Sequence, residues 1–108
     1  MIYIRGHQHD YADWVDAGAE GWSWPELLPH FVRTENNLNL NGPLHGQGGP
    51  LTASDLPSVH PVTRAMIDAG VQAGYAHVAD FNDGQAQGVG LYQVNYLHAK
   101  RSSIARNA

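Results

Sequence analysis

Residues 23–32 read SWPELLPHFV, and this stretch carries the strongest helix signal in the chain. Ser23 and Glu26 have the spacing of a capping box, and Pro25 stands at an early helical position where its missing N–H costs nothing. Four apolar residues then fall on one stripe at helical spacing, namely Leu27, Leu28, Phe31 and Val32. We therefore predict a helix over residues 24–35, with Pro29 in or just past its first turn.

Two further helices flank this one in the sequence. Asp10 can cap a helix over residues 10–17, and Gly18 suits the left-handed position after it. Residues 61–73 are followed by Gly74 and place five apolar residues on one face, namely Val62, Ala65, Met66, Ala69 and Ala73. The spacing predicts a helix over residues 61–73.

Strand signals are weaker. Residues 51–54 could form a short strand leaving the Gly- and Asn-rich loop at 36–50, and residues 91–98 alternate as a strand does. In the second stretch Tyr92, Val94 and Tyr96 share one face, while Gln93 and Asn95 share the other, which we expect to face water or a partner. Ser102 or Ser103 could cap a further short helix. The fold class expected is α+β, with three short helices, long loops and one or two short strands.

Composition narrows the classes of function. The chain has 108 residues, no Cys, 10 acidic and 6 basic side chains and a net charge of −4. We expect no nucleic-acid partner, because phosphate binding needs a concentrated basic face. The apolar start at residues 1–4 is far shorter than the roughly 20 residues that span a bilayer. We expect a soluble cytoplasmic protein with no membrane partner.

A histidine cluster near the start is the strongest local suggestion of a metal. His7, His9, Asp10 and Asp13 lie close in sequence, and zinc would need a further ligand, such as His30, His45, His60, His77 or His98. The offsets do not reproduce a known metallohydrolase pattern, so we predict no metal site. No G-x-S-x-G elbow is present, and no Ser, His and Asp set is fixed by spacing.

Two other features have a structural and a functional interpretation. The glycines at 45–50 could cradle phosphate, but no strand signal precedes them and no helix signal follows, so a tight structural turn is favoured. The second feature is a group of four aromatic residues, namely Tyr11, Trp14, Trp22 and Trp24. Such residues could stack on a flat ligand, but at helical spacing they more often pack in a core.

Taken together, these segments resemble the glucose-methanol-choline (GMC) family of FAD-dependent oxidoreductases, especially its choline dehydrogenase-like members. The matching residues begin with residues 1–7, Asp10, Tyr11, Trp14, residues 21–24, Leu28, Pro29 and Phe31. They continue in order with His45, Gly46, residues 48–51, Ser54, Asp55, Ala69, Gly70, residues 73–75, residues 80–82, residues 88–90, Tyr92, Gln93, residues 101–103, Ala105 and Arg106. Each match is weak alone, but the ordered set covers nearly the whole chain.

The resemblance implies that residues 1–108 are a single partial domain, covering the FAD and entering the substrate domain of a larger flavoenzyme. It places Met1, Ile2 and Tyr3 near the flavin in an intact enzyme. The dinucleotide-binding loop would precede Met1 and the catalytic histidine would follow Ala108, so we expect no catalytic residue here and no FAD bound to this chain alone.

The expected function is therefore that of a segment of an FAD-dependent alcohol oxidoreductase acting on CH–OH donors, inactive by itself. The alternative is a stand-alone oligomeric binding or interaction module that reuses the segment. Isolated from a flavin domain, the chain should expose apolar surface and unpaired strand edges at residues 1–4 and 91–98. We thus expect a homo-oligomer, most simply a dimer, with Tyr3, Trp22 and Trp24 as candidate contacts, or a flavin-domain partner chain.

Overall fold

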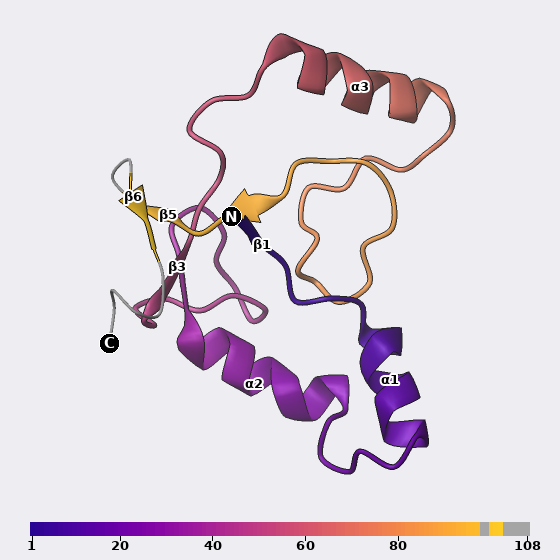
Figure 1. The fold of residues 1–108 in the computed structure, drawn as a ribbon, viewed down its shortest axis with the longest axis vertical. Coiled ribbons are helices and arrows are strands. Elements are labelled where there is room, and N and C mark those ends of the chain that lie inside the picture. The colour runs from indigo at the N-terminus through magenta and orange to yellow at the C-terminus, as the bar shows by residue number, and fades with distance from the viewer. Residues whose placement is uncertain (98–99, 103–108) are drawn as a thin grey trace.

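The computed structural model describes residues 1–97 and 100–102, and it has the mixed α+β architecture expected from the sequence (Figure 1). The helices are α1 (Gln8–Asp16), α2 (Trp24–Thr34) and α3 (Pro61–Gln72). The strands are β1 (Ile2–Tyr3), β2 (Glu35–Asn37), β3 (Leu51–Ala53), β4 (Gln93–Val94), β5 (Tyr96–Leu97) and β6 (Lys100–Arg101). The helix suggested after Ser102 or Ser103 falls on residues 103–108, outside the described part of the chain.

Capping residues explain where the first two helices begin. At α2, Ser23 and Glu26 form the predicted capping box, and Pro29 lies inside the helix just past its first turn. At α1 the predicted cap was wrong, because the helix starts at Gln8 and His7 is the N-cap. The His7 ring accepts a hydrogen bond from the His9 N–H, and Asp10 accepts one from the His7 N–H, so Asp10 completes a capping box from inside the helix.

Strands that are far apart in sequence pair in small two-stranded sheets. β1 pairs antiparallel with β4, with Ile2 opposite Val94, and β2 pairs parallel with β3. The edges of residues 1–4 and 91–98 were expected to be unpaired, but part of each is paired with the other. The predicted strand at 91–98 is also broken into β4 and β5 at Asn95, and its last residue, His98, is outside the described part.

The faces of β4 are the reverse of those predicted. Gln93 and Asn95, expected to face water or a partner, are each only 7% exposed, whereas Tyr92 is 38% exposed. The reason is hydrogen bonding, since buried polar groups are tolerated when they are paired. Asn95 Nδ2 donates to the Thr52 carbonyl at 3.1 Å, and Gln93 contacts Asn37 and Asp55.

The buried side chains of the described residues are mostly polar. The apolar ones are Tyr3, Tyr11, Ala53 and Val78, and the polar or charged ones are Arg5, Glu35, Asn37, His45, Thr52, Ser54, Asn82, Gln93, Asn95 and Ser102. A chain with so small an apolar interior obtains little stability from hydrophobic burial alone. Its strands and loops are therefore held mainly by paired polar groups.

Helix α3 lies apart from α1 and α2, at the other end of the molecule in Figure 1. None of its residues is buried, and Val62 and Met66 on its apolar face are 59% and 70% exposed. It touches the rest of the chain at Gly70, where a Cβ would lie 2.8 Å from the Val89 side chain. In the part of the chain that the structure describes, no helix is long and apolar enough to cross a membrane.

The molecule is more extended than an isolated domain of its length. Its radius of gyration is 15.3 Å, against about 13 Å for a compact chain of this size. Its accessible surface is 7138 Å², against about 5900 Å² for a monomer of this mass. The excess of about 1200 Å² is larger than the roughly 800 Å² that each partner buries in a standard-size protein interface.

Candidate functional site

Strand β1 and the residues beside it have two sharply different sides. Ile2 and Ile4 are 60% and 51% exposed, so they form an apolar outer face, and the preceding residue Met1 is also exposed, at 54%. Tyr3 and Arg5 alternate with them and are only 7% and 4% exposed. Since successive side chains of a strand point to opposite sides, one side of β1 is free for contact and the other is fixed in the interior.

Arg5 is the main anchor on the inner side. Its Nη2 donates to Glu35 Oε2 at 2.6 Å, and the side chains of both residues are 0% exposed. Its Nη1 donates to the Leu44 carbonyl at 2.6 Å, and its backbone N–H donates to Asn82 Oδ1 at 2.8 Å. The position of Arg5 is thus set by three separate segments of the chain.

Glu35 is the first residue of β2, and its carboxylate links Arg5 to the loop at 45–50 and to Asn37 on the same strand. Its Oε2 also accepts from the Gly46 N–H at 2.8 Å, and its Oε1 accepts from Asn37 Nδ2 at 2.8 Å. A buried ion pair repays its desolvation cost only when further hydrogen bonds satisfy the remaining polar atoms. No buried side-chain nitrogen or oxygen among the described residues lacks a hydrogen-bond partner.

His45 and Gln93 extend these contacts to the remaining segments. His45 Nε2 lies 2.9 Å from Asp80 Oδ2, and His45 Nδ1 lies 3.3 Å from Glu35 Oε1. Gln93 on β4 accepts from Asn37 Nδ2 at 2.7 Å and donates to Asp55 Oδ1 at 2.8 Å. We use the name polar network for the set Arg5, Glu35, Asn37, His45, Asp80, Asn82 and Gln93.

Two tyrosines adjoin the polar network, and burial raises the pKa of each. Desolvation is the main cause at Tyr3, where hydrogen bonding from Arg5 opposes it only partly. Burial also raises the pKa of Tyr11, whose hydroxyl donates to the Arg5 carbonyl. Both hydroxyls therefore stay neutral near β1, where they act as hydrogen-bonding groups and not as bases.

Within the described residues, the candidate metal ligands considered from the sequence do not gather into one set. His7 Nδ1 and His9 Nδ1 lie 3.0 Å apart with stacked rings, and His7 is occupied in capping α1. His45, one of the possible distant ligands, belongs to the polar network instead. Among residues 1–97 and 100–102 there is no group of three or more His, Cys, Asp or Glu side chains that could hold a metal ion.

The glycines at 45–50 form a structural turn against α2, as predicted. A Cβ on Gly46 would overlap the Val32 carbonyl, and a Cβ on Gly49 would overlap the backbone of Thr34 and Glu35. The space beside Gly46 and Gly49 is filled by protein backbone, so these two glycines leave no room for a phosphate beside them.

The aromatic residues divide between the two predicted roles. Tyr11, Trp24 and Phe31 pack together between α1 and α2, with ring centroids 5.6–6.2 Å apart, and Trp24 also covers Gly84. Trp14 and Trp22 contact each other, yet both are 49% exposed. Packing between helices accounts for the first group, and the second remains available for contact.

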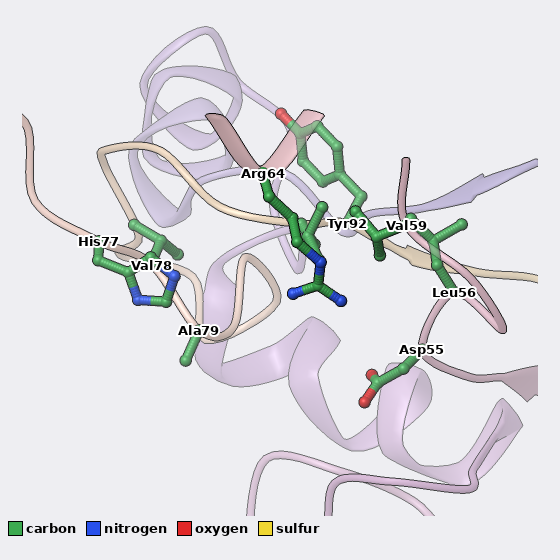
Figure 2. A pocket seen from close by; sticks show the side chains of 9 residues that line it. Asp55, Leu56, Val59, Arg64, His77, Val78, Ala79 and Tyr92 are labelled. Atoms are coloured by element: carbon green, nitrogen blue, oxygen red, sulfur yellow. The ribbon is translucent and has the colours of Figure 1, made fainter. Parts of the chain in front are cut away.

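A cleft of about 300 Å³ lies between α3 and the segments before β4 (Figure 2). Arg64 extends its guanidinium into this space toward Asp55, with His77 and Val78 on the far wall. Asp55 is itself held by Gln93 and by a hydrogen bond from its backbone N–H to Asn39 Oδ1 at 2.8 Å. Side chains of opposite charge face the cleft, so it lacks the single sign of charge that would select an anion.

The polar network was not predicted as a site. Its residues are scattered from position 5 to position 93, and spacing along the chain cannot reveal contacts across such separations. One signal was present, however. Five of its members stand among the residues that carry the family resemblance, namely Arg5, His45, Asp80, Asn82 and Gln93. The only indication of a buried network in the sequence was therefore that polar residues occur among those that carry the family resemblance, next to apolar residues of the expected strands.

Comparison with known proteins supplies a context for this arrangement. The profile of the GMC oxidoreductase family matches residues 1–108. The chain is 39% identical over 107 residues to alcohol dehydrogenase [acceptor] of Pseudomonas putida, covering 98% of this chain and 19% of that protein. It is 43% identical over 108 residues to oxygen-dependent choline dehydrogenase of Photobacterium profundum, covering 97% of this chain and 19% of that one.

A solved structure agrees with these sequence matches. An FAD-dependent oxidoreductase from Chaetomium thermophilum superposes with a TM-score of 0.88 and 28% identity, covering 99% of this chain and 21% of that one. The chain thus spans about one fifth of the length of the relatives it matches.

Proposed function

The chain belongs to the GMC oxidoreductase family, and from that membership we propose that it is the FAD-covering and substrate-domain segment of an FAD-dependent alcohol oxidoreductase that acts on CH–OH donors. It works with a flavin-binding segment, either on the same polypeptide or on a partner chain. When bound, FAD supplies the hydride acceptor for oxidation of the alcohol.

The observation that carries this proposal is the two-sided β1. Its outer face, formed by Ile2 and Ile4, is apolar and exposed, which fits a cover over a flat aromatic ring system and the exclusion of water from it. Its inner side is fixed by Arg5 and Asn82. The chemistry of these side chains fits the flavin end of the cofactor and not its phosphates, since the outer face has no charged donor.

The residues Met1, Ile2 and Tyr3 are proposed to contact the flavin in different ways. Ile2 presents its side chain on the outer face and Met1 has an exposed side chain, whereas the Tyr3 side chain is turned inward, where its hydroxyl accepts from Arg5 Nε at 3.3 Å. Tyr3 therefore approaches the cofactor through its backbone, and its side chain holds Arg5.

A segment exchange tests this function. The corresponding fifth of the Pseudomonas putida alcohol dehydrogenase is replaced by residues 1–108, and the purified chimera is assayed for bound flavin and for dye-linked alcohol oxidation. We expect both to be retained, and a matched chimera with Ile2→Lys to lose flavin or turnover. A folded chimera without flavin, or an Ile2→Lys chimera equal to the unmodified one, would contradict the proposal.

The isolated chain provides the complementary measurement. We expect it to be colourless and to oxidise no alcohol when FAD and an artificial electron acceptor are added, because hydride transfer needs both reactants held in near-attack geometry. The alternative function, a stand-alone oligomeric module, draws support from the exposure of Val62, Met66 and Tyr75. A stable colourless oligomer, together with a chimera that lacks flavin, would favour that alternative.

A further inference from the structure

His45 is the residue of the polar network whose two ring nitrogens both face carboxylates. Its Nε2 lies 2.9 Å from Asp80 Oδ2, and its Nδ1 lies 3.3 Å from both carboxylate oxygens of Glu35. Its side chain is 5% exposed, so water cannot replace either contact at full strength. A neutral imidazole has one N–H and one lone pair, and here the lone pair would face a carboxylate.

Asn37 does not supply a hydrogen for that lone pair. Its Nδ2 lies 3.4 Å from His45 Nδ1, but its two hydrogens have closer acceptors, Glu35 Oε1 at 2.8 Å and Gln93 Oε1 at 2.7 Å. The orientation of the Asn37 amide is fixed independently, because its Oδ1 accepts from the backbone N–H groups of Asn39 and Leu40. The contact with Nδ1 is therefore satisfied only if Nδ1 itself donates.

Charge balance also favours a His45 ring in which both nitrogens carry a proton. The charged groups around the ring are Glu35 and Asp80, and Arg5 lies across Glu35. With a neutral His45 this group of four side chains would carry one uncompensated negative charge, in a site where the side chains of Arg5, Glu35 and His45 are at most 5% exposed and that of Asp80 is 21% exposed. With an imidazolium it contains two positive and two negative charges. Buried charges are tolerated when they are paired in this way.

We propose that His45 is held as an imidazolium that donates from both ring nitrogens, and that it is a positioning residue for β1. The path from the ring to the strand is continuous. Asp80 accepts from His45 through Oδ2 and from the Asn82 N–H through Oδ1, at 2.8 Å. Asn82 in turn accepts from the Arg5 N–H and donates to the Tyr3 carbonyl at 3.3 Å. His45 thereby links Glu35 on β2 to the turn at residues 80–82, where the Asn82 side chain hydrogen-bonds the backbone of β1 and of Arg5 beside it.

The consequence for a cofactor rests on the proposed function. The outer face of β1 can be held at a fixed height above a flavin only if the inner side does not move. Two elements of the polar network set that inner side, the Arg5–Glu35 ion pair and the path through His45, Asp80 and Asn82. Loss of the His45 charge would weaken the path through Asp80 and Asn82 and leave the Arg5–Glu35 ion pair in place.

The experiment uses the full 108-residue chain and needs no flavin. Long-range nitrogen–proton NMR correlations separate an imidazolium from either neutral tautomer, and the His45 signals are assigned by their loss in His45→Gln. Near neutral pH we expect both His45 nitrogens to show the protonated signature. A spectrum with one unprotonated His45 nitrogen would overturn the proposal.

The positioning role is tested by Asp80→Asn, which keeps an acceptor for Nε2 and removes the charge. We expect the His45 signals to shift toward a neutral tautomer, and amide exchange at Arg5 to accelerate about tenfold, the size expected for loss of one charge-assisted hydrogen bond. Asp68→Asn on exposed α3 is the matched control and should change neither. Unchanged His45 signals and Arg5 exchange in Asp80→Asn would overturn the positioning role. Failure of the chimera would leave these results intact, so the two proposals fail separately.

Discussion

Glu35 is a carboxylate without exposed surface, and it accepts hydrogen bonds from Arg5, Asn37 and Gly46. Replacing it by glutamine changes its volume little but removes the charge that compensates Arg5. Breaking a buried ion pair in this way typically costs about 3–5 kcal/mol, and small domains have only about 5–15 kcal/mol in total.

We therefore predict that Glu35→Gln lowers the free energy of unfolding by several kcal/mol, as measured by urea denaturation. Glu20→Gln serves as the control, because Glu20 is exposed and should leave the midpoint unchanged. An equal midpoint for the two variants would show that the Arg5–Glu35 pair contributes little to folding.

The raised pKa of Tyr3 predicts that the folded chain loses stability at alkaline pH. Burial raises its pKa above the value of 10.0 for an unperturbed tyrosine, so the folded chain holds the phenol proton more tightly than the unfolded chain does. That contribution is fully present below pH 10 and is lost as the pH rises through the folded-state pKa.

We expect thermal unfolding to move to lower temperature as the pH rises above about 10, and Tyr3→Phe to show a smaller decline over the same range. Tyr75→Phe is a suitable control, since Tyr75 is 63% exposed. Parallel declines in the native chain and in Tyr3→Phe would contradict the assignment to Tyr3.

At the scale of the elements, the loop at 45–50 depends on the absence of side chains at two glycines. A Cβ on Gly49 would overlap the backbone at the end of α2, and backbone cannot move aside cheaply. We predict that Gly49→Ala destabilises the chain by about 1–3 kcal/mol or more, the usual range for overpacking.

Gly48→Asn provides the comparison for Gly49→Ala. Gly48 has open space around it and a φ of +79°, a conformation that asparagine tolerates better than most residues. Circular dichroism during thermal unfolding should show a large loss for Gly49→Ala and a small one for Gly48→Asn. The reverse order would mean that the close approach of the loop to α2 is not what fixes this turn.

The helices were predictable from sequence because their signals are local. Ser23, Glu26 and Pro25 set the start of α2, and Gly74, with a φ of +97°, follows α3 as expected. The start of α1 was missed because a histidine side chain took the capping role that Asp10 was expected to fill.

The sheets were less predictable because their partners are distant in sequence. No local pattern indicates that Ile2 lies opposite Val94. The alternation in β4 was read correctly as period two, but the buried side was assigned by hydrophobicity. Gln93 is buried because Asn37 and Asp55 pair with it, and those partners come from elsewhere in the chain.

At the scale of the whole molecule, the exposed apolar surface predicts association. Val62 and Met66 on α3, together with Trp22, are at least 49% exposed. At about 25 cal/mol per Å² of apolar area, covering a few hundred Å² offers several kcal/mol before the entropy of association is subtracted. Of the contacts predicted from sequence, Trp22 remains available, Trp24 is largely taken up by packing between helices, and Tyr3 is buried and unavailable.

We predict that the isolated chain forms a homo-oligomer at micromolar concentration, most simply a dimer, as measured by light scattering. The double variant Val62→Glu and Met66→Glu should shift the chain toward monomer, while Asp68→Asn on the same helix should not. A monodisperse native monomer whose unfolding is independent of concentration would contradict the prediction.

The pairing of β1 with β4 also sets the order of events during synthesis. β1 leaves the ribosome before β4, which is made about 90 residues later, and at 5–20 residues per second this is a delay of roughly 5–18 seconds. Throughout that interval Arg5 lacks Asn82, and the apolar residues of β1 have no strand beside them. Slower translation therefore lengthens the time for which β1 lacks the hydrogen-bonding partners that fix it.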